Sequence, residues 1–206
     1  MDILISIVAL IIALTLHEFA HAFMGDYLGD PTARHAGRIS LNPMAHIDPF
    51  TTLVLPLLLI LAHSPVIFAA AKPVPFNPWA VRGGKWGAAM VAFAGPATNL
   101  AIAVFFSVWL RLIPGNVMAY QILGTMIIIN VSLFVFNMIP FPPLDGSRLL
   151  YAVAPAGLRE VMDRIERSGM IVLFVLLLVG YQFIAPFVGK ITLFILSFLF
   201  PGSPLP

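Results

Sequence analysis

Residues 3–24 read ILISIVALIIALTLHEFAHAFM and place three ionisable side chains, His17, Glu18 and His21, inside a predominantly apolar stretch. About 20 predominantly apolar residues are enough for a helix to cross a bilayer, so the stretch predicts a membrane-spanning helix. Only two residues precede it, neither is basic, and no cleavage site of small residues is evident. We therefore interpret it as a helix of the mature protein and not as a signal peptide.

The three polar residues have the spacing H-E-x-x-H. Histidines four positions apart lie on one face of a helix, so both imidazoles can reach one ion. Two histidine ligands, an adjacent glutamate base and one open position are the arrangement of zinc hydrolases. The motif therefore predicts His17 and His21 as metal ligands and Glu18 as a general base. The structural alternative is three polar side chains that hydrogen-bond along a seam between helices.

The whole chain has the composition of a membrane protein. Of its 206 residues, 60% are hydrophobic and only 10% are charged, and the mean hydropathy is +1.00. Soluble proteins have about 25% charged residues, so this composition excludes an ordinary soluble enzyme and a disordered chain. The 11 basic and 9 acidic residues are too few for a nucleic-acid interface. Because there is no cysteine, histidine, aspartate or glutamate must hold any metal.

Further apolar stretches cover residues 51–71, 87–110, 119–139 and 169–185, and a shorter one covers 191–200. Prolines inside and just after the first of them cannot continue a helix, so 51–77 is predicted as a re-entrant or extended hairpin, with a full span as the alternative. The predicted fold is an all-α polytopic membrane protein with three core transmembrane helices around the metal, this hairpin, and one or two C-terminal helices. Residues 1–206 form one domain, with its core at about 3–150 and its C-terminal helices at about 151–206.

A third metal ligand is predicted at Asp145, in the segment NMIPFPPLDG that covers residues 137–146. Its three prolines break the helix directly after an apolar run. Broken helices at membrane depth are tolerated where protein or a water-filled cavity surrounds them. Gly146 permits a tight turn that would aim the carboxylate at the histidines. The alternative is that Asp145 caps the helix that follows.

The H-E-x-x-H helix and the 137–146 segment together resemble the site-2 protease family, the intramembrane zinc metalloproteases, in its compact prokaryotic form without PDZ or CBS domains. Residues 94–99, AGPATN, resemble the Gly-Pro-x-x-Asn start of the family's middle core helix. The resemblance implies one Zn²⁺ per chain, with cobalt or manganese as alternatives. It implies zinc ligation by a set of three residues: His17, His21 and Asp145. It also implies that Glu18 is the catalytic glutamate.

Two asparagines are candidates for a hydrogen bond to the oxyanion of the reaction. Asn137 matches the asparagine that the family has eight residues before its ligand aspartate, and Asn99 closes the Gly-Pro-x-x-Asn segment. Either amide could donate to a developing negative charge. An asparagine in an apolar helix can equally hydrogen-bond to a neighbouring helix, and for Asn99 this alternative stays open.

Ligands on different helices must meet at one depth, and this condition constrains the topology. Asp145 would emerge on the opposite face from His17 if 51–71, 87–110 and 119–139 all crossed, so an even number of crossings is expected between residues 25 and 87. A re-entrant 51–77 also places nine basic residues on one side, which is the bias of a cytosolic face. These are Arg34, Arg38, Lys72, Arg82, Lys85, Arg148, Arg159, Arg164 and Arg167. We expect a multi-pass protein of a prokaryotic cell membrane with a cytosol-facing site.

The implied function is hydrolysis of peptide bonds within or near transmembrane segments of membrane-protein substrates, in regulated intramembrane proteolysis or in clearance of signal-peptide remnants. The expected partners are such substrates and the lipid bilayer, and no nucleic acid. One alternative is a metal transporter or channel with His17, His21 and Asp145 as a transit site, which would have no need of Glu18. Another is a catalytically inactive scaffold. The extended residues 72–78 could pair with substrate as an added strand.

Overall fold

The computed structural model describes residues 3–63 and 71–200, and within these ranges every regular element is helical. Helices of four or more residues, including the π-helix η2, are α1 (Ile3–Tyr27), α2 (Thr32–His35), η2 (Pro49–Val54), α3 (Leu55–Leu61), α4 (Gly84–Leu112), α5 (Val117–Asn137), α6 (Asp145–Val153), α7 (Ala156–Arg167) and α8 (Met170–Leu199); a short 3₁₀ turn, η1 (Pro43–Ala45), precedes η2. Four helices are long and apolar enough to cross a membrane: Ile3–Tyr27, Gly84–Leu112, Val117–Asn137 and Leu178–Leu199. The prediction of an all-α, multi-pass membrane protein is confirmed.

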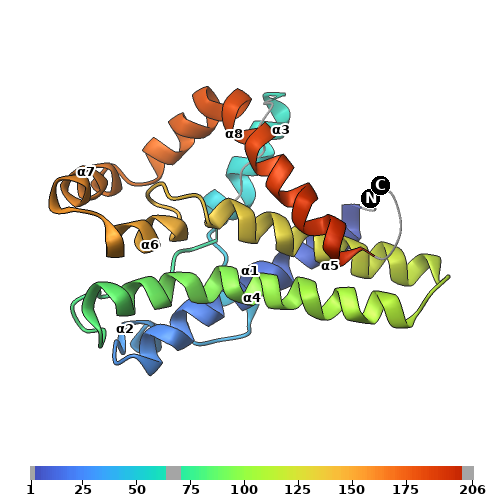
Figure 1. Ribbon diagram of the computed structural model, residues 1–206, viewed down its shortest axis with the longest axis horizontal. Helices are drawn as coiled ribbons and strands as arrows, with labels where there is room; N and C mark the ends of the chain where they lie inside the picture. Colours follow the sequence, from blue (N-terminus) through green and yellow to red (C-terminus); the bar gives the residue numbers. More distant parts are fainter. Residues whose placement is uncertain (1–2, 64–70, 201–206) are drawn as a thin grey trace.

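The helix α4 lies at the centre of the fold and contacts α1, α5 and α6. Figure 1 shows α4 and α5 along the length of the molecule, with α1 behind them and α6 and α7 at the end where α4 begins. The buried faces of α1 and α4 are rich in small residues: Ala9, Ala13 and Ala22 on α1, and Ala88, Ala92, Gly95 and Ala103 on α4. Small side chains let membrane helices approach closely, which brings the α4 backbone next to the polar residues of α1.

The C-terminal residues form one helix where the sequence indicates two separate apolar stretches, 169–185 and 191–200. The helix α8 runs without interruption through Pro186, and Figure 1 shows it sharply bent near its middle. A proline inside a helix removes one backbone hydrogen bond and bends the helix, and membrane helices tolerate this. The two stretches therefore belong to one helix, which agrees with the smaller of the two predicted numbers of spans, and within the described residues Leu178–Leu199 is long and apolar enough to cross.

The far end of α8 is fixed against α4 and α5. Leu196 and Phe200 belong to the main hydrophobic cluster, with Ile127 and Val131 of α5 as its fully buried centre. Two side chains of α4 also donate to carbonyl groups at this helix end: Ser107 to Leu199 O at 2.5 Å and Arg111 to Phe198 O at 2.7 Å. These bonds satisfy acceptors that a helix end leaves unpaired.

The chain around 51–77 leaves the helical core and returns to the same place. The backbone N–H of Lys72 donates to His46 O at 2.8 Å, so the two ends of the segment touch. Between them, η2 and α3 follow each other without a break and contain 6 and 7 residues, together fewer than the about 20 that a full crossing needs. Residues 64–70 lie outside the described part of the chain. Ends that meet are the geometry that a re-entrant hairpin requires.

Candidate metal centre

Three potential ligand atoms converge from two distant parts of the chain. The Nε2 atoms of His17 and His21, on α1, are 2.9 Å apart. The Oδ2 atom of Asp145, at the start of α6, lies 3.2 Å from the first and 3.3 Å from the second. Within the part of the chain that the structure describes, this is the one group of histidine and acidic residues able to hold a metal ion. The sequence predicted all three members.

Hydrogen bonds at the other ring nitrogens fix the tautomers of both histidines. Nδ1 of His21 lies 2.8 Å from the carbonyl oxygen of Val91, and Nδ1 of His17 lies 2.6 Å from Oδ1 of Asn99. Because both partners only accept, both Nδ1 atoms carry a proton in the neutral rings, and both Nε2 atoms present lone pairs. Two lone pairs and a carboxylate oxygen then face one another.

Such a convergence of acceptors is favourable when a cation lies between them. Oδ2 of Asp145 is buried and has no hydrogen-bond donor among the described residues, which is what a metal ligand requires. A tetrahedral zinc with bonds of about 2.0–2.1 Å separates its ligand atoms by about 3.3 Å, close to the two distances from Asp145. The donor set therefore fits zinc.

Glycines allow the elements that carry the site to come together. A Cβ atom on Gly95 of α4 would lie 2.6 Å from Cε1 of His21 and 2.7 Å from Cε1 of His17. A Cβ atom on Gly146 would lie 2.5 Å from the carbonyl carbon of Met138, where the chain leaves α5. Neither position has room for a larger residue. The N-cap of α6 is Leu144, so Asp145 does not cap this helix, which was the alternative to a role as a metal ligand.

A cleft of about 490 Å³ opens beside the three convergent side chains. Glu18 and Asn137 line it from α1 and α5, and residues 73–76, which have no regular secondary structure, form another wall. The amide of Asn137 donates to Leu133 O at 3.0 Å, one helical turn back. The cleft thus brings Glu18, Asn137 and the backbone of residues 73–76 to the same place as the potential ligands.

Asn99 does not line this cleft. Its side chain is fully buried, its oxygen faces Nδ1 of His17, and its Nδ2 donates to Oδ1 of Asn130 at 2.9 Å. The amide therefore lies on the side of His17 that is turned away from Asp145. The oxyanion interaction considered for Asn99 does not agree with this placement, because both ends of the amide are already bonded inside the helical core.

Two charged residues that the sequence analysis did not single out hold the wall at residues 73–76 in place. The guanidinium of Arg38 donates to the carbonyls of Ala45, Lys72 and Pro73, the last two at 2.8 and 2.7 Å. A carboxylate oxygen of Asp30 accepts from the backbone N–H of Asn77 at 2.7 Å. Both side chains are buried. In the sequence they look like ordinary charges of a polar loop, and only their tertiary contacts distinguish them.

The same hydrogen bonds keep Asp30 ionised. Burial alone would raise the pKa of this carboxyl group, but bonds from the Asn77 N–H and from Thr32 outweigh it and hold the pKa below its ordinary value. The stabilisation that Asp30 provides is therefore present above the ordinary aspartate pKa and is lost as the pH falls through the lowered value.

These features define a class: a multi-pass membrane protein with a candidate metal centre of two histidines and an aspartate beside a glutamate. Comparison with known proteins gives the family. The chain is 37% identical over 179 residues to "Putative zinc metalloprotease YwhC" of Bacillus subtilis, a match that covers 82% of this chain and 78% of the relative. This chain belongs to that family of zinc metalloproteases, which is of the site-2 protease type.

More distant relatives agree with this assignment. "Putative zinc metalloprotease Rip2" is 28% identical over 170 residues in Mycolicibacterium smegmatis and 30% identical over 156 residues in Mycobacterium tuberculosis. These matches cover 82% and 75% of this chain but 64% and 57% of the two relatives, so the chain spans less than two thirds of either Rip2 protein. No family model matches the chain, and no solved structure matches it.

Proposed function

We propose that this protein is an intramembrane endopeptidase that hydrolyses peptide bonds within or near the transmembrane segments of membrane-protein substrates. The observation that carries the proposal is the position of the three convergent ligand atoms and Glu18: they line one cleft, and three of the four helices that can span a membrane lie around it. Regulated intramembrane proteolysis and the clearance of signal-peptide remnants are the processes that such an activity would serve.

His17, His21 and Asp145 would hold one Zn²⁺ per chain. A bound zinc ion supplies Lewis-acid chemistry: it polarises a carbonyl group and lowers the pKa of a water molecule to about 7. Two neutral imidazoles and one carboxylate would leave such an ion with a net positive charge, and the cleft beside them would give water and substrate access to it.

Glu18 would be the general base and then the general acid. Its carboxylate takes a proton from the attacking water and passes it to the amine that leaves. Asn137, which lines the same cleft, has a second amide N–H besides the one on Leu133 O and would donate it to the oxyanion. For Asn99 we propose a different role, which is to orient His17.

The substrate must enter as extended backbone, because a helix uses its own carbonyl groups. Residues 73–76 have no regular secondary structure, and Val74 precedes Pro75, which favours an extended backbone at that position. Alternate residues of an extended chain point their N–H groups to the same edge. Pro73 and Pro75 have no N–H group, whereas Val74 and Phe76 do. We infer that the edge with the N–H groups of Val74 and Phe76 pairs with the substrate as an added strand and holds the scissile bond next to Glu18.

Val74→Pro removes one of these N–H groups and is expected to lower the rate of cleavage by about tenfold, the effect of about one lost hydrogen bond of 1–1.5 kcal/mol. Zinc content should not change. The control is Val74→Leu, which keeps the N–H and should cleave at close to the wild-type rate. Equal rates for the proline variant and the wild type would exclude pairing through residue 74.

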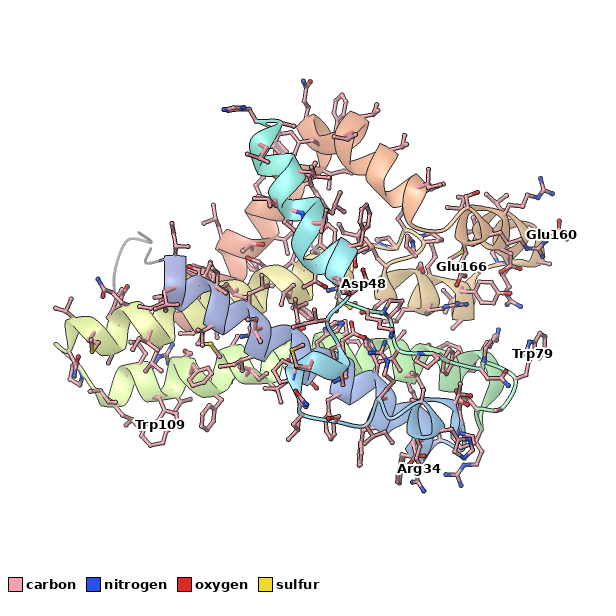
Figure 2. All side chains as sticks on the ribbon, turned by 180° about the vertical axis from the view of Figure 1, so that it is seen from behind. Arg34, Asp48, Trp79, Trp109, Glu160 and Glu166 are labelled. Atoms are coloured by element: carbon pink, nitrogen blue, oxygen red, sulfur yellow. The ribbon has the colours of Figure 1, made fainter. Side chains whose placement is uncertain are left out.

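Exposed tryptophans suggest how the protein lies in the membrane. Trp86 and Trp109 are both exposed on α4, and 23 residues of helix separate them by about 35 Å, close to the hydrocarbon thickness of a bilayer. Figure 2 shows Trp109 and Trp79 at opposite ends of the molecule. Val91 and Gly95, which contact the histidines, follow Trp86 by five and nine residues, so we infer a site about 8–14 Å below the Trp86 end.

The basic residues identify that end as cytosolic in our proposal. Arg34 lies at the same end as Trp79 in Figure 2, and the helices α6 and α7, with four arginines, lie at this end in Figure 1. Arg111 marks the opposite end of α4. An excess of basic residues on one side is typical of the cytosolic face, which would place the N-terminus outside.

Single cysteines test this orientation, because the chain has none of its own. Trp79 is 94% exposed, so a cysteine at this position is accessible. Trp79→Cys should react with a membrane-impermeant thiol reagent only after the cells are opened. Asn116→Cys, in the loop between α4 and α5, is the matched control and should react in intact cells. The reverse pattern would contradict a cytosolic site.

The function itself is tested with the purified, full-length chain in lipid vesicles. A labelled transmembrane peptide should be cleaved, a zinc chelator should stop cleavage, and added zinc should restore it. A soluble peptide of the same length without an apolar segment should remain intact. Absence of cleavage together with zinc flux into the vesicles would instead support the metal transporter.

A further inference from the structure

We propose that Asn130, in the middle of α5, is a positioning residue that fixes the amide of Asn99 and, through it, the tautomer of His17. The inference rests on the proposed function, because it takes His17 to be a metal ligand. Asn130 is fully buried and has no contact with the cleft. Its importance follows from a chain of hydrogen bonds that begins at a backbone carbonyl and ends at the imidazole.

The first link is the carbonyl oxygen of Met126, which can only accept. Asn130 lies 2.8 Å from it, so the atom at that position must be the amide nitrogen Nδ2. The oxygen Oδ1 of Asn130 then points away from its own helix and across to α4. There it accepts from Nδ2 of Asn99 at 2.9 Å.

The second link is the amide of Asn99. Its nitrogen faces two acceptors, Oδ1 of Asn130 and the carbonyl oxygen of Ala13, the latter at 3.4 Å. Its oxygen is therefore left for Nδ1 of His17, at 2.6 Å. An amide oxygen can only accept, so the Nδ1 atom must carry the proton and the lone pair must be at Nε2, on the side of Asp145.

The two histidines differ in what holds them. His21 donates to the carbonyl oxygen of Val91, which is backbone and cannot reverse. His17 depends on the side chain of Asn99, whose amide can turn by half a rotation and exchange donor for acceptor. Asn130 provides the shorter of the two bonds that oppose this rotation. Without Asn130, the reversed amide would donate to Nδ1 and favour the tautomer with its proton at Nε2, where the metal would bind.

Burial restricts the amides of Asn99 and Asn130 to this orientation. Asn99 and Asn130 are both fully buried, so water does not compete for their donors and acceptors. An unpaired polar group in a membrane interior is costly, so loss of one partner favours any rotation that pairs the other. Partners of this kind behind a metal-ligating histidine typically change metal affinity by about 10–100-fold when they are removed.

The test compares three variants of the full-length chain in detergent. Asn130→Leu has a similar volume but no acceptor, whereas Asn130→Asp, which burial keeps in its neutral form, has an O–H for Met126 O and an oxygen that accepts from Asn99. Ile127→Val, one turn earlier on α5 and equally buried, changes the packing without changing the hydrogen bonds. The readouts are zinc affinity, measured by competition with a chromophoric chelator, and the thermal unfolding of the metal-free chain.

We expect Asn130→Leu to weaken zinc binding by about 10–100-fold, and Asn130→Asp and Ile127→Val to remain within about threefold of the wild type. Two results would overturn the proposal: a folded Asn130→Leu with wild-type affinity, or an Ile127→Val that weakens zinc binding as much. If Asn130→Leu does not fold, a loss of more than tenfold in Asn130→Asp would overturn it as well. A wild-type chain that binds no zinc would refute the proposed function instead.

Discussion

Glu18→Gln is expected to lower the rate of peptide cleavage by about 10²–10⁴-fold, the usual contribution of a general acid–base group. Glutamine has nearly the same shape as glutamate but cannot take a proton from the attacking water. Glu18 lines the cleft and is not one of the three residues whose ligand atoms converge. The zinc content of the variant should therefore remain that of the wild type, so that activity is lost without loss of metal.

Glu160 provides the matched control for this substitution. It is an exposed glutamate of α7, and Figure 2 shows it at the outer edge of the molecule. Glu160→Gln makes the same chemical change and should leave both cleavage and zinc content unaltered. If Glu18→Gln cleaved the reconstituted transmembrane peptide as fast as Glu160→Gln does, Glu18 would not be the base.

Asp145→Ala is expected to abolish stable zinc binding and, with it, cleavage. The carboxylate is the only negatively charged member of the three convergent residues, and its Oδ2 lies 3.2 and 3.3 Å from the two imidazole nitrogens. Loss of a ligand should weaken binding by more than the roughly 10–100-fold that an outer partner contributes. Zinc per chain, measured by atomic emission after dialysis against a weak chelator, should fall from about one toward zero.

Asp26→Ala is a suitable comparison, because Asp26 pairs with Arg34 at the polar end of α1 and lies away from the three ligand atoms. It removes a carboxylate of the same kind and should retain zinc. Retention of a full zinc equivalent by Asp145→Ala would show that the metal binds elsewhere in the chain.

The three candidate ligands were predictable from the sequence because their signals are local. The spacing of His17 and His21 alone places both rings on one helical face, and Asp145 is distinguished by the prolines before it and the glycine after it. Their convergence did not follow from spacing. It depends on the close packing of α1 against α4 at Gly95 and on the turn at Gly146, and these are tertiary contacts.

The residues that support the site could not be found in this way. Asn130 is one polar residue in an apolar helix, and its sequence context is the same whether it serves a neighbouring helix or the metal centre. Arg38 and Asp30 appear in a polar loop, where charged residues normally face water. Their hydrogen bonds to the wall at residues 73–76 and its ends join residues that are 34 to 47 positions apart. Neither a periodicity nor a motif in the sequence indicates such hydrogen-bonded pairs.

The continuity of α8 stayed open at the sequence level for a similar reason. Pro186, Gly189 and Lys190 follow one another closely and suggest that a helix ends there. Contacts further along the chain oppose this: Leu196 and Phe200 pack against α5, and Ser107 and Arg111 bind the carbonyls at the helix end. The helix therefore bends and continues, because local breaking signals are weaker than the packing of its last two turns.

The central claim is that His17, His21 and Asp145 together hold one zinc ion. Zinc K-edge X-ray absorption of the purified wild-type chain tests it most directly, combined with the zinc content of the same sample. The account predicts about one zinc per chain, with two imidazole nitrogens and a carboxylate oxygen at about 2.0–2.2 Å. A chain without zinc, or a zinc spectrum that is the same in the wild type and in His17→Ala, would contradict it.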